Sequence, residues 1–224
     1  MKEMDPLLVA ERCAEVLERG KLVILPTDTV YGLAARADMP GAVEAIFTAK
    51  GRDVEKALVV MVSDAGKAAE LAAPEERGSL QRLGALWPGP LTLVVKTGDI
   101  PWRETVAPGS EALGIRVPDS PFLIRLLGIS GPLAVTSANP AGGRAPASFE
   151  DIHAELLGAV GLAVDGGYRG SGEPSTVAEI RGGEIRVLRQ GKITEDELRQ
   201  ALMHDREDEP PRTAGCERKG RDFS

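Results

Sequence analysis

A nearly continuous apolar run from Ala57 to Val62 is the feature that most constrains the fold of this chain. Such runs are typical of strands in a sheet that is covered on both faces. A turn at Gly183, between the last two apolar runs, predicts a hairpin and therefore a sheet with both parallel and antiparallel pairs. Seven further runs predict strands, at residues 22–25, 91–96, 112–117, 133–136, 162–164, 176–180 and 185–188.

Patterns typical of helices separate several of these strands. The two helices nearest the C-terminus start with Ser or Thr followed three residues later by an acidic residue, which is the spacing of a capping box. Helices and strands together predict a single α/β domain of two or three layers, with a mixed parallel and antiparallel sheet flanked by helices. The expected helices run from Pro6 to a stop at Gly20 and over residues 40–49, 120–129, 148–158 and 194–203.

The C-terminal end of the chain differs in composition from the rest. Residues 204–224 contain one large apolar residue, Phe223. Such a segment cannot bury enough apolar surface to offset the entropy that ordering costs. We therefore expect one folded domain over residues 1–203 and a charged, disordered tail over residues 204–224.

Charge and composition exclude several classes of protein. The 224 residues include 27 basic and 34 acidic side chains, so the chain lacks the basic surplus of a protein that binds nucleic acid non-specifically, and any anion site must be local. Two distant cysteines and two histidines offer no disulfide framework, zinc site or Ser-His-Asp arrangement. Without a signal peptide or a long apolar run, we expect a cytoplasmic protein with no membrane contact.

Two polar stretches near predicted strands contain candidate binding residues. The segment PTDTVYGL (26–33) places two hydroxyls and a carboxylate directly after a strand, where α/β sheets commonly bind ligands. A polar turn with Asp28 as a helix cap is the alternative. The second stretch carries Lys50, Arg52 and Lys56, which could wrap a polyphosphate, or could form a solvated charged turn.

Three more stretches follow later in the chain. Arg116 lies inside an apolar strand, so its charge must be paired in a salt bridge or must bind a carboxylate. The segment 135–144 combines hydroxyls, an amide, glycines and Arg144, and is either an anion-binding nest or an ordinary loop. The segment WPGPLT (87–92) is interpreted as a rigid start to a strand.

Eight motifs in order closely resemble the YrdC family of threonylcarbamoyl-AMP synthases, from about residue 20 to about residue 192. They are PTDTVYGL, AKGR, WPGPLTLV, GIRVP, TSAN, DGG, PSTV and LRQG. The resemblance implies an enzyme that joins L-threonine, bicarbonate and ATP to threonylcarbamoyl-adenylate and pyrophosphate, for threonylcarbamoyl-adenosine modification of tRNA. It also implies a twisted YrdC-like sheet with a basic concave surface.

The resemblance further implies Mg²⁺ as the companion of ATP and a downstream tRNA threonylcarbamoyl-transferase complex as partner, with contact to tRNA itself as a further expectation. Lys50 and Arg52 would act catalytically by neutralising charge on the triphosphate. The residues expected to bind threonine are Thr29, Arg116 and Ser175. Those expected to bind ATP are Lys50, Arg52, Lys56, Ser137, Asn139 and Arg189.

The chain departs from the family pattern at a few positions, and two other functions stay open. Met61 stands where many relatives have His, and Ala145 replaces a Ser that often follows the TSAN motif. One alternative function is an RNA-binding module, which the acidic balance disfavours. The other is a paralogue that acts on another carbamoyl-adenylate; the chain has none of the extra segments of the related hydrogenase maturation proteins.

Overall fold

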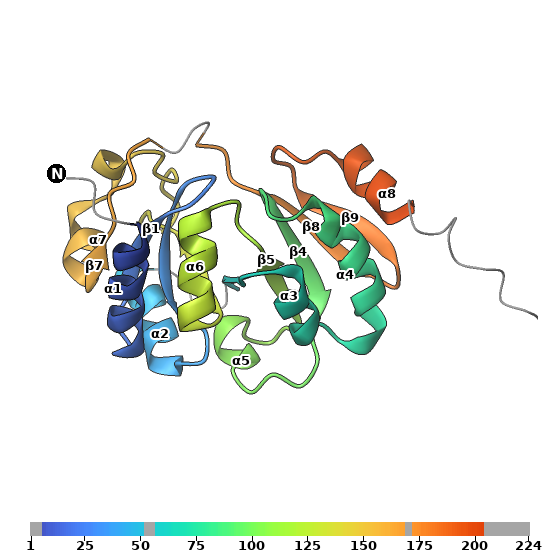
Figure 1. Ribbon diagram of the computed structural model, residues 1–224, viewed down its shortest axis with the longest axis horizontal. Coiled ribbons are helices and arrows are strands. Elements are labelled where there is room, and N and C mark those ends of the chain that lie inside the picture. Colours follow the sequence, from blue (N-terminus) through green and yellow to red (C-terminus); the bar gives the residue numbers. More distant parts are fainter. Residues whose placement is uncertain (1–5, 52–56, 169–171, 204–224) are drawn as a thin grey trace, which may run out of the picture.

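The computed structural model of the protein describes residues 6–51, 57–168 and 172–203. One twisted sheet of nine strands, in the order β7-β1-β2-β6-β3-β5-β4-β8-β9, runs through these residues (Figure 1). The strands are β1 (Val23–Pro26), β2 (Tyr31–Arg36), β3 (Val59–Met61), β4 (Leu91–Lys96), β5 (Ala112–Arg116), β6 (Leu133–Ser137), β7 (Leu162–Ala163), β8 (Thr176–Arg181) and β9 (Glu184–Arg189).

Strand pairing confirms the predicted mixed sheet. The pairs β1–β7, β3–β5 and β4–β8 are parallel, whereas the other five are antiparallel. The hairpin expected at the end of the chain joins β8 to β9. Its turn uses Gly182 and Gly183, whose φ angles of 59° and 82° favour glycine. The basic character of the wider concave surface stays a prediction.

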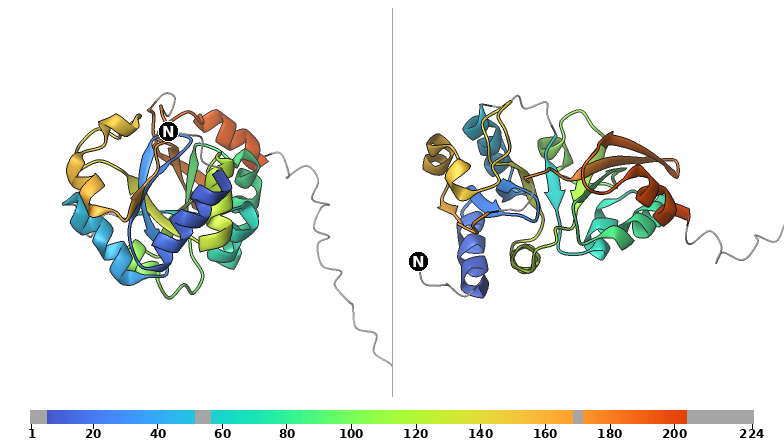
Figure 2. Two further views of the ribbon diagram at one scale, coloured as in Figure 1. Left: turned by 60° about the vertical axis from the view of Figure 1, so that its left-hand side comes forward. Right: turned by 90° about the horizontal axis from the view of Figure 1, so that it is seen from above.

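Helices lie on both sides of the sheet (Figure 2). Two of them, α1 and α6, pack side by side in front of β1 in the view of Figure 1. The α-helices are α1 (Pro6–Glu18), α2 (Pro40–Lys50), α3 (Ala65–Leu71), α4 (Arg77–Leu83), α5 (Arg103–Val106), α6 (Pro121–Ser130), α7 (Ala154–Ala159) and α8 (Glu195–Met203). The short 3-10 helices are η1 (Pro74–Glu76), η2 (Gly84–Leu86) and η3 (Phe149–Asp151).

Alternating side chains of the strands divide the core between the two faces of the sheet. Val23 and Leu25 of β1 pack in a cluster with α1 and α6, whereas Ile24 belongs to a larger cluster with α2. Because successive side chains of a strand point to opposite faces, these clusters cover opposite faces. On the face that carries α1 and α6, the residues Val94 of β4 and Gly114 of β5 are only half-buried. The cavity described below lies there.

Several predicted boundaries are confirmed by their hydrogen bonds. The Ser120 side chain accepts from the Leu123 amide at the start of α6. At the start of α8, the Thr194 amide donates to the Glu197 carboxylate at 2.7 Å, and the Glu197 amide donates to the Thr194 hydroxyl at 3.3 Å. These contacts form the predicted capping box.

Other predictions were wrong or incomplete. The helix expected over residues 148–158 is broken into η3 and α7, because Ile152 and His153 have extended backbones with ψ of 127° and 136°. The sequence did not indicate β2, α3, α4 or α5. The predicted tail over residues 204–224 lies outside the described residues. No helix among the described ranges is long and apolar enough to cross a membrane.

Tyr31, the first residue of β2, connects two loops to the sheet. It is fully buried, and its hydroxyl donates to the Gly167 carbonyl at 2.7 Å and accepts from the Gly166 amide at 3.0 Å. Its own amide donates to the Pro146 carbonyl at 2.9 Å, and its carbonyl accepts from the Ala138 amide at 2.8 Å. Tyr31 therefore fixes the loops after β6 and β7 against β2.

Replacing Tyr31 by Phe removes the hydroxyl and leaves the two glycine backbone groups without that partner. We expect Tyr31→Phe to lower the free energy of unfolding by about 1–3 kcal/mol, since two hydrogen bonds of a buried hydroxyl are lost. Tyr168→Phe is the matched control, because Tyr168 is 69% exposed. Chemical denaturation measures the difference, and equal stability of the two variants would contradict this role of Tyr31.

Candidate functional site

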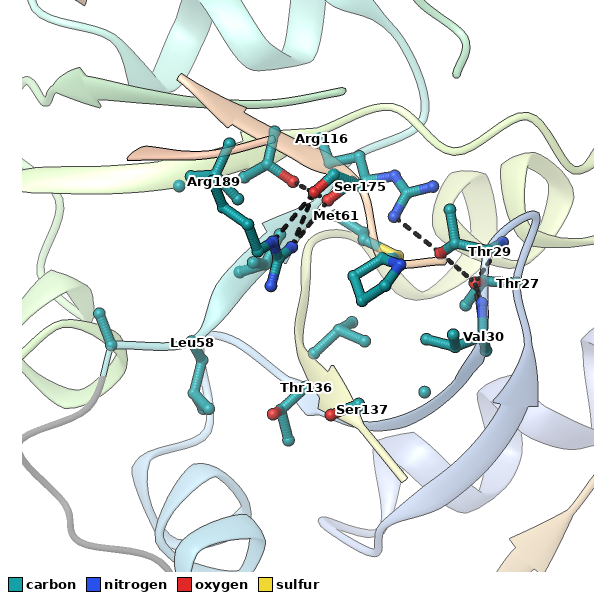
Figure 3. A pocket seen from close by; sticks show the side chains of 18 of the residues that line it. Thr27, Thr29, Val30, Leu58, Met61, Arg116, Thr136, Ser137, Ser175 and Arg189 are labelled. Atoms are coloured by element: carbon teal, nitrogen blue, oxygen red, sulfur yellow. Dashed lines mark hydrogen bonds between the residues drawn. The ribbon is translucent and has the colours of Figure 1, made fainter. Parts of the chain in front are cut away.

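A cavity of about 450 Å³ opens on the face of the sheet that carries α1 and α6, beside these helices (Figure 3). Strands β2, β3, β4, β5, β6, β8 and β9 all contribute to its wall, together with the loops before β2 and β8. The charged side chains in the described part of its lining are two guanidinium groups, those of Arg116 and Arg189. Seven hydroxyls join them, from Thr27, Thr29, Thr92, Ser110, Thr136, Ser137 and Ser175. Cations and hydroxyl donors without a lining carboxylate favour an anionic ligand.

The cavity brings together five of the nine site residues that the sequence predicts: Thr29, Arg116, Ser137, Ser175 and Arg189. Lys50 and Asn139 do not belong to its described lining, although both contact the Ser137 carbonyl. Arg52 and Lys56 lie outside the described residues. The five residues come from five separate motifs spread over 160 positions of the chain, from 29 to 189, and the sheet order places them at one site.

Hydrogen bonds within the β1–β2 loop fix its two threonines. The Thr27 hydroxyl donates to the Val30 carbonyl at 2.6 Å and accepts from the amides of Thr29 and Val30 at 3.1 and 3.2 Å. Thr27 and Thr29 are 2% and 3% exposed, and their hydroxyl oxygens are 3.1 Å apart. The segment therefore forms a tight polar turn, as one interpretation of the sequence predicted, but it joins two strands and Asp28 caps no helix.

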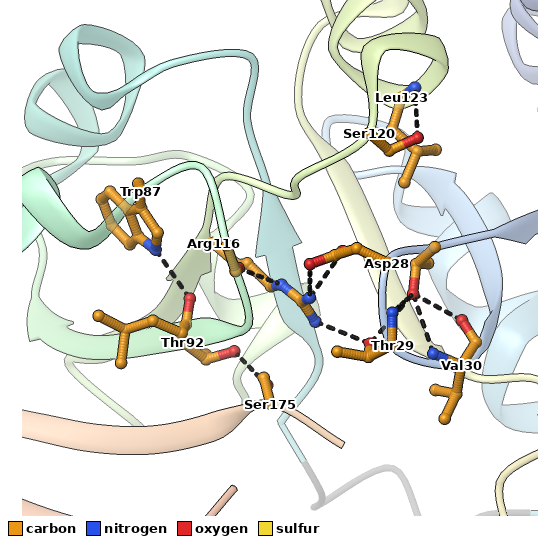
Figure 4. A network of polar contacts seen from close by, with 12 residues as sticks. Asp28, Thr29, Val30, Trp87, Thr92, Arg116, Ser120, Leu123 and Ser175 are labelled. Carbon is orange, nitrogen blue, oxygen red and sulfur yellow. Dashed lines mark hydrogen bonds and ion pairs between the residues drawn. The ribbon is translucent and has the colours of Figure 1, made fainter. Parts of the chain in front are cut away.

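Arg116 at the end of β5 forms the structural salt bridge that the sequence left as one of two alternatives. Its Nη2 contacts both carboxylate oxygens of Asp28 at 2.7 Å, its Nε donates to the Gly89 carbonyl at 3.1 Å, and its Nη1 donates to the Thr29 hydroxyl at 3.2 Å (Figure 4). Burial lowers the pKa of Arg116, and the charge of Asp28 opposes that shift. The salt bridge does not exclude carboxylate binding, because Arg116 also lines the cavity.

The WPGP motif contributes more than the rigid strand start that its prolines predicted. Its Gly89 carbonyl is the acceptor for Arg116, and the Gly89 amide is held by the Val117 carbonyl at 3.0 Å. A Cβ at this position would lie 3.0 Å from the Leu86 carbonyl oxygen, so Gly89 suits the crowded turn. Trp87 packs in the core, as expected.

Ser175 and Arg189 form a second polar group on the wall. The Ser175 hydroxyl is 2.9 Å from the Thr92 hydroxyl, and Arg189 donates from Nε and Nη2 to the Ser175 carbonyl at 3.1 and 2.9 Å. Burial lowers the pKa of Arg189, and the positive charge of Arg116 lowers it further. An anion bound between the two guanidinium groups would relieve that repulsion.

A β-bulge turns Arg189 toward the cavity. In the β8–β9 ladder, Ala178 pairs with Val187 and Val177 pairs with Arg189, so Leu188 is an extra residue. Directly opposite residues of an antiparallel pair share a face, and Val177 lines the cavity. Without the bulge, alternation would place Arg189 on the same face as Val187.

Lys50 and Asn139 shape the loop that carries Ser137. Lys50 is 5% exposed, and its Nζ donates to the Ser137 carbonyl. The Asn139 side-chain amide donates to the carbonyls of Pro140 and Gly143, each at 2.8 Å, while its buried Oδ1 has no hydrogen-bond partner in the described part of the chain. Both residues are therefore next to the cavity wall and stabilise its shape, while the nucleotide roles expected of them stay predictions.

Some cavity residues were missed by the sequence analysis. Thr92 was treated as part of the strand, yet its position alternates with the buried Leu91 and Leu93, and this alternation could have placed it on the other face. Met61 and Ala145, the two departures from the family pattern, both line the cavity. Cys13 lies on the buried face of α1, and burial raises its pKa to about 12, so it supplies no thiolate.

No group of three or more His, Cys, Asp or Glu side chains in the described ranges could hold a metal ion. The described lining of the cavity also lacks a carboxylate. Mg²⁺ prefers carboxylate and phosphate oxygens. The described residues therefore offer no carboxylate cluster for a resident magnesium ion.

The fold and the cavity define an α/β protein with a cavity on its sheet, in whose described lining the charged side chains are those of two arginines. Residues 15–191 match the family model Sua5_yciO_yrdC, which carries the description "Telomere recombination". The chain therefore belongs to the Sua5/YciO/YrdC family, in agreement with the resemblance that the motifs indicated.

Relatives and a solved structure support this assignment. The chain is 34% identical over 199 residues to threonylcarbamoyl-AMP synthase of Bacillus subtilis, covering 88% of this chain and 57% of the relative. It is 33% identical over 192 residues to the enzyme of the same name from Pyrococcus abyssi, covering 84% and 56%. The crystal structure of P. abyssi Sua5 complexed with L-threonine superposes with a TM-score of 0.80, at 32% identity, covering 89% of this chain and 58% of that one. The chain thus spans little more than half the length of these relatives.

Gly191, the last residue of the LRQG motif, allows a close backbone approach behind Ser175. A Cβ there would lie 2.5 Å from the Thr176 nitrogen and 2.6 Å from the Pro174 oxygen, closer than such atoms approach. We expect Gly191→Ala to displace the segment that carries Ser175 and to lower the free energy of unfolding by about 1–3 kcal/mol.

Gly78→Ala is the matched control for this substitution. Gly78 lies in α4, and a Cβ there would meet nothing within 4 Å. Because alanine has the higher helix propensity, Gly78→Ala should stabilise the fold by up to about 1 kcal/mol. Thermal and chemical denaturation compare the two variants. A Gly191→Ala protein as stable as the wild type would show that the backbone can yield at this site.

Proposed function

We propose that the protein is an L-threonylcarbamoyladenylate synthase, which converts L-threonine, bicarbonate and ATP to threonylcarbamoyl-AMP and pyrophosphate. The observation that carries the proposal is the single cavity in which residues of five family motifs meet around two guanidinium groups. The names of the Bacillus and Pyrococcus relatives and the threonine complex of the P. abyssi protein support it.

The reaction joins anionic partners in two steps. The threonine amine, after losing a proton, attacks the carbon of bicarbonate, and loss of water gives a carbamate. A carbamate oxygen then attacks the α-phosphorus of ATP, the bond from that phosphorus to the bridging oxygen breaks, and pyrophosphate leaves. Such a step is accelerated mainly by holding the reactants in line and by neutralising charge on the phosphoryl oxygens.

The cavity offers groups for both tasks. Thr29, Arg116 and Ser175 would bind threonine, with Arg116 facing the carboxylate. Arg189 and the Ser137 hydroxyl would face the nucleotide. Lys50 and Asn139 would act on ATP from behind the Ser137 loop, with Arg52 and Lys56 contributing from the adjoining segment. Mg²⁺ would arrive bound to the ATP phosphates, since the described wall offers it no carboxylate.

The proposed product determines the partners. Threonylcarbamoyl-AMP is an activated mixed anhydride, so a downstream tRNA threonylcarbamoyl-transferase complex would consume it, and contact of this chain with tRNA itself is part of the proposal. ATP, threonine and bicarbonate are all available in the cytoplasm, which we propose as the site of the reaction.

Pyrophosphate release by the purified protein tests the proposed function directly. With ATP, Mg²⁺ and bicarbonate, we expect release that requires L-threonine and that is much weaker with L-serine, ammonia or no amine. Release with ammonia but not with threonine would instead identify a paralogue that makes another carbamoyl-adenylate. No pyrophosphate release with any of the amines would overturn the enzymatic proposal and favour an RNA-binding module.

A pair of variants on β9 tests the nucleotide role of Arg189. Arg189→Gln removes a charge from the cavity wall, so we expect the KM for ATP to rise at least about tenfold, since hydrogen bonds to charged groups contribute roughly 1.5–3 kcal/mol. Arg186→Gln removes the same charge from an exposed position of the strand outside the cavity lining and should change KM little. Equal KM values for the two variants would contradict the role of Arg189.

A further inference from the structure

The ion pair between Asp28 and Arg116 is unusual in its geometry. Both carboxylate oxygens of Asp28 contact one nitrogen, Nη2, at 2.7 Å, and the two side chains are 11% and 4% exposed. A second Arg–Asp pair, Arg36 with Asp38, uses Nε and Nη2 for one oxygen each, at 2.9 and 2.6 Å, and is more exposed. The exposed pair thus has the usual fork geometry, and the buried pair has not.

Three of the five N–H groups of the Arg116 guanidinium have partners among the described residues. Nε donates to the Gly89 carbonyl, one Nη1 hydrogen goes to the Thr29 hydroxyl, and one Nη2 hydrogen is shared by the two oxygens of Asp28. A fork to a substrate carboxylate needs two parallel N–H groups on neighbouring nitrogens, and both forks of a guanidinium include Nη2. Such a fork would place a second carboxylate on the nitrogen that Asp28 already contacts, and the two like charges would repel each other.

The Thr29 hydroxyl can supply the second donor. The Thr27 hydroxyl donates its hydrogen to the Val30 carbonyl. It also accepts hydrogen bonds from two backbone amides, which occupy both of its lone pairs. The Thr29 hydroxyl accepts from Arg116 Nη1 at 3.2 Å and lies 3.1 Å from the Thr27 hydroxyl oxygen. Because the lone pairs of that oxygen are already filled, the Thr29 hydrogen can turn to a ligand. Thr29 and Arg116 both line the cavity, whereas Asp28 does not belong to the described lining.

We infer that Asp28 is a positioning residue, which holds Arg116 so that its Nη1 and the Thr29 hydroxyl together receive the substrate carboxylate, one oxygen each. This inference rests on the proposed function and deepens it. Asp28 acts through Arg116: it occupies Nη2, stops the guanidinium from rotating and directs Nη1 into the cavity. It stays in place when substrate binds. If threonine instead displaced Asp28 from Arg116, removing the Asp28 carboxylate would raise the affinity for threonine.

Calorimetric titration with L-threonine separates these two roles. Asp28→Asn keeps the shape of the side chain but offers only one acceptor oxygen to Nη2, so we expect the Kd for threonine to rise at least about tenfold. The KM for ATP should change less than about twofold, because the ATP groups lie elsewhere on the wall. Asp28→Glu retains a carboxylate and should restore most of the affinity. Threonine binding to Asp28→Asn that equals or exceeds wild type would overturn the inference.

Asp38→Asn is the matched control. It removes the same charge from the other Arg–Asp pair, which lies at the far end of β2 and outside the cavity lining. Its threonine Kd and ATP KM should match those of the wild type. A loss of threonine affinity in Asp38→Asn as large as that in Asp28→Asn would show a general effect on folding and would contradict a specific role for Asp28.

Nitrogen-15 NMR of the arginine side chains tests the positioning without relying on the proposed function. The Arg116 signals are identified by their loss in Arg116→Lys. In the wild type we expect separate resonances for the Nη hydrogens, because Asp28 slows their rotation, and in Asp28→Asn we expect these to average. Wild-type protein that binds no threonine would refute the proposed function alone. A freely rotating Arg116 in the wild type, or unchanged signals in Asp28→Asn, would refute the inference.

Discussion

The buried positive charge of Arg116 is the constraint on which the rest of the site depends. A guanidinium that is 4% exposed must find partners inside the protein, and removal of one partner would leave an uncompensated charge. Its partners come from the β1–β2 loop and from the turn before β4. One charge thus joins three segments that lie far apart in the sequence, and it fixes their relative positions at the point where the cavity opens.

Much of the fold could be predicted because its strands are short apolar runs. The bounds of β4 agree with the expected residues 91–96, and the helix caps at Ser120 and Thr194 were readable from their spacing. Strand β2 was missed because its sequence, YGLAAR, has only one residue of high β propensity and follows a polar turn. The break at Ile152 and His153 could not be predicted, since a correctly placed capping box there starts only a single turn.

The site was predictable where a motif places its side chain directly on the wall, as for Arg116 and Ser175. It was less predictable where position depends on tertiary structure. Lys50 ends the helix α2 and points to the Ser137 carbonyl, which no sequence pattern indicated. The face that Arg189 occupies depends on the extra residue Leu188, and a bulge leaves no signature in an apolar run. The role of Gly89 depends on a carbonyl, which every residue has.

The bulge in β9 has a consequence beyond the cavity. Strand β9 is the last in the sheet order, so one of its edges has no neighbouring strand in the described part of the chain. Open edges can pair with strands of other molecules and lead to aggregation. The extra residue at Leu188 interrupts the regular spacing of backbone donors and acceptors that such pairing requires. Because a bulge increases the local twist of an edge strand, the irregularity that directs Arg189 into the cavity also makes this edge a poorer template for pairing with another chain.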